Sequence, residues 1–167
     1  MKKNLIACIA GALLSAVCLT GCANGTKSAE GTVDERFMKA ASESIEIMWD
    51  QIENDDLDAA DFYTEKHKEA YLPACEAELE KVEEFRNQQF EDEGLQEKAY
   101  EFIDALQNRV DALNCLPDDF SGYVDLWMDT NNTITEDICA FAFDYGMEVS
   151  DEYQETLQWY YDTFRTE

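Results

Sequence analysis

Residues 95–113 read LQEKAYEFIDALQNRVDAL, and the spacing of their apolar side chains decides the fold class. Apolar residues recur there every three or four positions, at Leu95, Ala99, Phe102, Ile103, Leu106, Val110 and Leu113. This is the period of an α-helix that buries one face. The stretch contains neither glycine nor proline, so no residue in it breaks a helix. We therefore predict a helix packed on a core.

The preceding sequence predicts a first helix with a defined start. Thr32 and Glu35 match a capping box, in which each side chain bonds the backbone of the other residue. The helix is expected to end near Asn54, and Asp56 is expected to cap the next helix.

The second predicted helix carries an apolar stripe over residues 63–90 that keeps its phase across Pro73. Proline removes a backbone donor and crowds the preceding turn. Because the stripe keeps its phase, we expect a kink near Pro73, or a short helix abutting a longer one, rather than a chain reversal. At about 1.5 Å per residue this helix would span about 50 Å.

After residue 113 the sequence predicts two further breaks. Leu116-Pro117-Asp118-Asp119 is expected to interrupt the third helix, and Asp118 can cap a further segment. Asn131-Asn132 is expected to turn the chain, because Thr133 and Glu136 match a second capping box. The last helix would then bend over residues 146–150.

These elements predict an all-α fold, an elongated antiparallel bundle of about four helices with kinks near Pro73 and Pro117. The chain has 167 residues with a formal charge of −26, which disfavours nucleic acid and anionic lipid headgroups as partners. Eight Tyr, nine Phe and three Trp nevertheless indicate a packed core rather than disorder.

The N-terminal segment has the organisation of an export signal. Lys2 and Lys3 precede a mostly apolar run over residues 5–19, which is too short for an ordinary membrane-spanning helix. Leu19-Thr20-Gly21-Cys22 follows and resembles the lipobox of bacterial lipoproteins. The resemblance implies cleavage before Cys22 and a diacylglycerol on its sulfur. An ordinary secretory signal cut nearby is the alternative.

The resemblance divides the chain into three parts. Residues 1–21 would be a lipoprotein signal peptide, residues 22–31 a flexible tether, and residues 32–167 the acidic helical domain. Loss of Lys2 and Lys3 would leave 10 basic against 38 acidic residues, a formal charge of −28. A cationic partner, divalent cations or simple solubility would each fit this charge.

Three cysteines remain after Cys22, and they cannot all pair with one another. If the chain reverses near Glu93, Cys75 and Cys115 are about 6 Å apart along the bundle axis, which makes them the best candidate for a disulfide. The alternative is that they are buried free thiols.

Catalytic and metal motifs are missing from the sequence. His67 is the only histidine, whereas di-iron bundles and histidine-rich zinc sites need more than one. We therefore expect a non-catalytic protein with no cofactor beyond the lipid, and His67 at the edge of the core. The acids near Asp55, Asp56 and Asp58 could hold Ca²⁺ loosely or simply be solvated.

The C-terminal aromatic residues are the remaining candidate contact site. Neighbouring helical residues diverge by about 100°, so Trp159 and Tyr161 should be partly exposed if Tyr160 points inward. An exposed ring near acidic groups can stack on a sugar or a cation.

These observations predict a lipid-anchored, extracytoplasmic bundle that acts as a binding or scaffold module at the cell envelope. Its partners would be the membrane, through the anchor, and an envelope protein or a cationic ligand. The alternative is a ligand-binding lipoprotein for divalent cations or for a small cationic or aromatic compound.

Overall fold

The computed structural model describes residues 31–164. Over this range the secondary structure is five α-helices and two short 3-10 helices, which confirms the all-α helical bundle. The expected signal peptide, the lipobox with Cys22, and all of the expected tether except Gly31 lie outside the described residues.

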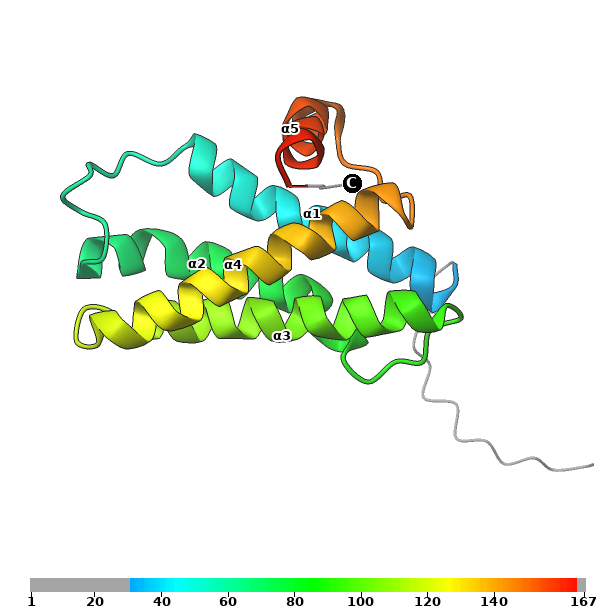
Figure 1. Ribbon diagram of the computed structural model, residues 1–167, viewed down its shortest axis with the longest axis horizontal. Helices are drawn as coiled ribbons and strands as arrows, with labels where there is room; N and C mark the ends of the chain where they lie inside the picture. Colours follow the sequence, from blue (N-terminus) through cyan, green and yellow to red (C-terminus); the bar gives the residue numbers. More distant parts are fainter. Residues whose placement is uncertain (1–30, 165–167) are drawn as a thin grey trace, which may run out of the picture.

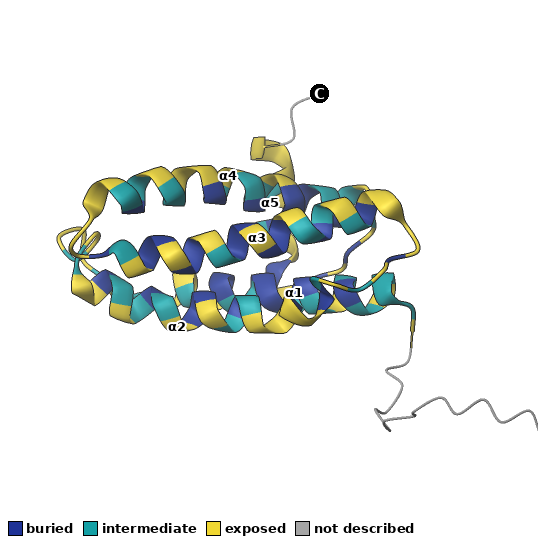
Figure 2. Cartoon of the chain, turned by 90° about the horizontal axis from the view of Figure 1, so that it is seen from below, coloured by how far each residue is buried: buried dark blue, intermediate teal, exposed yellow. Residues whose placement is uncertain are grey.

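Four of the helices form the antiparallel bundle: α1 (Val33–Glu53), α2 (Glu65–Val82), α3 (Glu93–Cys115) and α4 (Phe120–Phe143). The most extensive contact is between α3 and α4, followed by α1 with α2 and α2 with α3. The fifth helix, α5 (Gln154–Phe164), packs mainly on α4 and is seen nearly end-on in Figure 1. Each bundle helix turns a buried face inward and an exposed face outward (Figure 2).

The start of α1 confirms the predicted capping box. The Glu35 N–H donates to the Thr32 hydroxyl at 3.1 Å, and the Thr32 N–H donates to the Glu35 carboxylate at 2.9 Å. Both groups would otherwise be unpaired at a helix start. The helix ends at Glu53, with Asn54 as its C-cap, as predicted.

The prediction for the second helix was wrong at both ends. The helix begins at Glu65 rather than after Asp56, because aspartates of the intervening loop bond the backbone of that loop instead. Asp55 accepts from the Leu57 N–H at 2.8 Å, and Asp61 accepts from the Asp58 N–H at 3.0 Å.

The second helix also ends earlier than predicted. Its 18 residues span about 27 Å rather than 50 Å. It continues through Pro73, so the expected absence of a chain reversal there is confirmed. A short 3-10 helix η1 (Glu83–Phe85) follows it, and residues 86–92 lead to α3, where Asp92 is the N-cap.

The predicted turn at Asn131-Asn132 was also wrong, because α4 runs unbroken through both residues. The Thr133 hydroxyl donates back to the Asp129 carbonyl at 3.2 Å, so it does not cap a new helix. The kink predicted near Pro117 was wrong as well, because the chain reverses there: α3 ends at Cys115 and α4 packs back along it from Phe120 (Figure 1). The N-cap of α4 is Asp119, one residue after the predicted Asp118.

The predicted bend over residues 146–150 separates two helices, which is why there are five. After α4 ends, Gly146 adopts a φ of +75°, a value that favours glycine. The chain then passes through the 3-10 helix η2 (Asp151–Tyr153) into α5.

The core consists of two apolar clusters, one toward each end of the bundle. Between them, at the junction of α2 and α3, lies a buried ion pair. Arg109 Nη1 donates to Glu78 Oε2 at 2.7 Å, and the residues are only 6% and 1% exposed. Burial raises the pKa of Glu78, although Arg109 acts in the opposite direction.

Candidate functional site

A pocket with aromatic walls lies at one end of the bundle, between the end of α1, the start of α2 and the first half of α4. Its volume is about 370 Å³, within the size range of small-molecule sites. The lining residues come from these helices and from residues 54–64, here called the α1–α2 loop: Ile52, Phe62, Tyr63, His67, Tyr71, Tyr123, Val124, Trp127 and Met128.

Helical spacing brings the rings of the pocket together. His67 and Tyr71 are four residues apart on α2, and Tyr123 and Trp127 are four apart on α4, so each pair shares one helix face. The His67 ring centre lies 5.0 Å from that of Tyr71, 5.9 Å from Tyr123 and 6.0 Å from Trp127. Tyr123 and Trp127 stack at 5.3 Å with an interplanar angle of 25°.

Tyr63 joins the α1–α2 loop to α4. It has a φ of +67°, a left-handed conformation that is uncommon for a bulky residue. Its ring meets Phe120 at 5.3 Å and Tyr123 at 5.6 Å, both edge to face. Its N–H donates to Nδ1 of His67 at 3.2 Å. These contacts hold the loop in a strained conformation beside the pocket.

The bond from Tyr63 defines the protonation of His67. A neutral imidazole whose Nδ1 accepts a hydrogen bond carries its proton on Nε2, so Nε2–H is a donor. Burial lowers the pKa of His67, while Asp55 acts in the opposite direction, which favours this neutral form. His67 is 2% exposed as a residue, and no hydrogen bond joins its Nε2 to the described residues. Nε2 is nevertheless not among their fully buried polar atoms that lack a partner, so this donor can be reached from the pocket that His67 lines.

The phenols beside His67 are also uncharged. The Tyr71 hydroxyl donates to Asp55 Oδ2 at 2.7 Å, and burial followed by this bond raises the pKa of Tyr71. Burial likewise raises the pKa of Tyr123. The walls are therefore aromatic and neutral, and they offer π faces and a free N–H donor.

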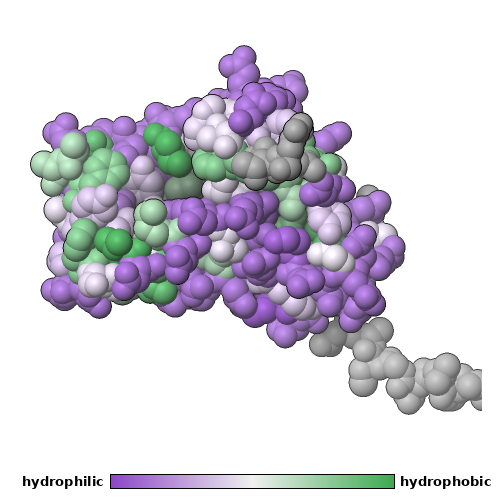
Figure 3. Space-filling view, viewed as in Figure 1, coloured by the Kyte–Doolittle hydropathy of each residue, from purple (hydrophilic) through white to green (hydrophobic). Residues whose placement is uncertain are grey.

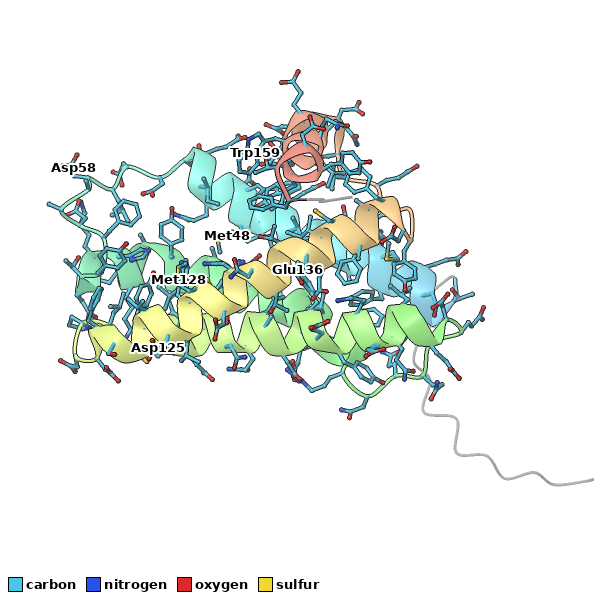
Figure 4. The ribbon with its side chains drawn as sticks, viewed as in Figure 1. Met48, Asp58, Asp125, Met128, Glu136 and Trp159 are labelled. Atoms are coloured by element: carbon cyan, nitrogen blue, oxygen red, sulfur yellow. The ribbon has the colours of Figure 1, made fainter. Side chains whose placement is uncertain are left out.

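The mouth of the pocket exposes an unusual amount of apolar surface. Five large apolar side chains at this end are at least 36% exposed: Ile52, Phe62, Tyr63, Phe120 and Met128. Apolar surface gathers at this end in Figure 3, and Figure 4 labels Asp58 on the loop and Met128 on α4. Exposed apolar patches rimmed by polar groups are typical of binding sites.

A larger groove of about 670 Å³ lies near the start of α1, but its acids have structural roles. Asp34 accepts from the backbone N–H groups of Glu91 and Asp92 at 2.8 and 3.0 Å. Asp92 caps α3, and Glu35 belongs to the capping box of α1. The aromatic pocket is therefore the better candidate site.

The candidate disulfide is not formed in the structure. Cys75 and Cys115 are both free thiols, and Cys115 Sγ bonds the Asp111 carbonyl at 3.5 Å. Cys75 is fully buried on α2, whereas Cys115 is the last residue of α3 and partly exposed, an offset that leaves them unpaired. Burial raises the pKa of the Cys75 thiol to about 12, so it stays protonated and unreactive.

The predicted exposure of the C-terminal aromatics is confirmed. Trp159 is 55% exposed and Tyr161 is 37% exposed, while Tyr160 packs against Trp49 at 5.7 Å. The Tyr161 ring lies 4.4 Å from that of Phe143. Both residues lie on α5, and neither lines the aromatic pocket.

Within residues 31–164 no group of three or more His, Cys, Asp and Glu side chains is arranged to hold a metal ion. In the same range, no helix is both long and apolar enough to cross a membrane.

The aromatic pocket was not foreseen from the sequence. His67 was expected at the edge of the core, and its burial agrees with this, but its place among five aromatic rings was not predicted. The available signal was the spacing of aromatic residues by four on α2 and on α4.

The chain matches no known family model, and neither the curated proteins nor the solved structures compared with it contain a match.

Proposed function

We propose that this chain is a lipid-anchored binding protein on the outer side of a bacterial membrane, and that its aromatic pocket holds a small organic ligand. The lipobox-like Leu19-Thr20-Gly21-Cys22 supports the anchor, because two or more acyl chains hold a protein firmly on a bilayer. The free Nε2–H donor inside an aromatic pocket is the single observation that carries the ligand.

The position of the pocket agrees with this proposal. The tether would enter at the start of α1, whereas Ile52 lies at the other end of that helix and lines the pocket. The 21 residues of α1 separate these points by about 30 Å. A ligand would therefore enter at the end of the bundle away from the anchor.

A scaffold role at the envelope is the second candidate, and the exposed rings of α5 favour it. Trp159 and Phe164 are 55% and 46% exposed and lie 5.5 Å apart. Aromatic side chains are enriched in protein interfaces.

Mass spectrometry of protein from the native host tests the anchor. The expected mature form begins at Cys22 and carries a diacylglyceryl mass, and a Cys22→Ala variant should lack that mass. A mature form that begins elsewhere would refute the anchor without touching the pocket.

Ligand binding is tested with phenyltrimethylammonium, a probe that offers both a ring and a cation. We expect it to shift the His67 ring resonances and to raise the melting temperature, since a ligand of the native state stabilises it. Trp127→Ala should abolish the shift, whereas Trp159→Ala, an exposed tryptophan outside the pocket, should not.

A further inference from the structure

We infer that the ligand of the aromatic pocket is a small quaternary ammonium compound with an oxygen acceptor close to the charged nitrogen. This inference rests on the proposed ligand-binding function and specifies its chemistry.

The π faces of the pocket supply the first argument. A cation over the face of a Trp, Tyr or Phe ring is attracted by the negative charge of that face, most strongly over Trp. Phe62, Tyr63, Tyr71, Tyr123 and Trp127 all contribute rings to one cavity of about 370 Å³. A methylated nitrogen suits such walls, because its methyl groups contact rings and need no hydrogen-bond acceptor.

The charges around the pocket supply the second argument. Among residues 31–164, no Lys or Arg lines it. The nearby Lys66 is paired with Asp61 at 2.6 Å, and Lys68 donates to the Leu116 carbonyl. The α1–α2 loop, which contributes Phe62 and Tyr63 to the lining, carries four aspartates: Asp55, Asp56, Asp58 and Asp61. A cleft with acidic surroundings and low-dielectric walls concentrates cations.

The free donor of His67 supplies the third argument. His67 lines the pocket, and its Nε2 is not among the fully buried polar atoms that lack a partner, so a ligand in the pocket can reach this N–H. A ligand oxygen that accepts from Nε2–H therefore gains a hydrogen bond that a ligand without an acceptor cannot make. A primary ammonium would present further N–H donors and would leave them without acceptors among the rings. A hydroxyl or carbonyl oxygen near a trimethylated nitrogen satisfies both requirements.

Titration of the full chain, held in phosphatidylglycerol nanodiscs so that no detergent enters the pocket, tests the inference on unaltered protein. Choline is compared with 3,3-dimethylbutan-1-ol, which has the same shape but no charge, and with tetramethylammonium, which has the charge but no oxygen. The readouts are heat of binding and the His67 ring resonances.

We expect choline to bind about tenfold more tightly than the neutral alcohol, and more tightly than tetramethylammonium. Added salt should weaken choline binding and leave the alcohol unchanged. Trp127→Ala should remove the preference for the cation, and Trp159→Ala is the matched control.

The remaining outcomes separate the two proposals. Equal binding of choline and the alcohol would overturn the ammonium specificity and leave the pocket as a site for neutral ligands. Equal binding of choline and tetramethylammonium would overturn the role of Nε2–H. If choline, the alcohol and phenyltrimethylammonium all fail to bind, both this inference and the ligand-binding function are refuted.

Discussion

Removing Arg109 from the buried ion pair should destabilise the protein strongly and in a pH-dependent way. At the observed 2.7 Å, and with an effective dielectric constant of about 20, the attraction between Arg109 and Glu78 is about 6 kcal/mol. Moving two charges out of water costs several kcal/mol per ion, so the net contribution of the intact pair is small. The raised pKa of Glu78 agrees with a burial cost that outweighs this attraction.

Arg109→Met removes the attraction and leaves the Glu78 carboxylate with its burial cost. The expected loss is about 3–5 kcal/mol at neutral pH. The double variant Glu78→Leu with Arg109→Met removes both charges and should recover most of that loss or exceed the original stability.

The loss caused by Arg109→Met should shrink at mildly acidic pH. In that variant Glu78 has a pKa above its unfolded value, so the folded state keeps the proton to a higher pH than the unfolded state does. Relative stability therefore rises as the pH falls through the folded-state pKa. Urea unfolding followed by circular dichroism measures the free energy of unfolding at both pH values.

Two results would contradict this prediction. A loss from Arg109→Met that is equal at neutral and acidic pH would show that an unpaired Glu78 charge is not its cause. A double variant less stable than Arg109→Met alone would show that the pair contributes a large net stabilisation.

Three further predictions concern a cap, a buried acid and the pocket. Thr32→Ala should lower the free energy of unfolding by about 1 kcal/mol, because Thr32 caps α1. Thr133→Ala should lower it by less than about 0.5 kcal/mol, because Thr133 caps no helix. Equal losses of the two variants in urea unfolding would contradict this prediction. Burial raises the pKa of Asp137 to about 7, although its partner Lys98 acts in the opposite direction. The folded state therefore keeps this proton to a higher pH than the unfolded state does, and the protein should lose stability as the pH rises from the ordinary aspartate range toward neutrality. Asp137→Asn should flatten that slope in urea midpoints measured against pH, and an unchanged slope would exclude Asp137 as its source. Bound choline should lower the pKa of His67 further, because protonation of His67 would place two cations in one pocket. The ring resonances of His67, the only histidine of the sequence, measure this pKa with and without choline. A pKa that rises on choline binding would contradict the prediction.

The helical fold could be predicted because its main signal is local. The apolar period of residues 95–113 and the capping box at Thr32 each depend on neighbours within a few positions, and the structure has both. The absence of a chain reversal at Pro73 could also be predicted, since the apolar stripe keeps its phase on both sides of it.

The two capping boxes show where local reasoning fails. Thr32 follows Gly31, which has a φ of +106° and cannot extend a helix backward. Thr133 has the same spacing to a glutamate, but buried residues on both sides, Thr130 and Ile134, continue one helix face through it. Tertiary burial therefore outweighs a motif whose own contribution is about 1 kcal/mol.

The pocket could not be predicted, because it depends on how elements meet rather than on any one of them. The sequence places His67 on the face of one helix and Trp127 on the face of another. Their contact at 6.0 Å requires the correct length of the α1–α2 loop, which the sequence prediction made too short. It also requires the left-handed Tyr63, whose conformation no residue pattern indicated.

Two departures from an ordinary stable bundle coincide at this one pocket. Tyr63 adopts a strained backbone conformation, and large apolar side chains such as Met128 stay exposed. Both features cost stability, and sequences retain such costs mainly at functional sites. A ligand that covers the apolar rim would offset the second cost while it accepts from Nε2–H of His67. Binding should therefore order the α1–α2 loop, and slower amide hydrogen exchange at Tyr63 with choline present would reveal that coupling; unchanged exchange at saturating choline would contradict it.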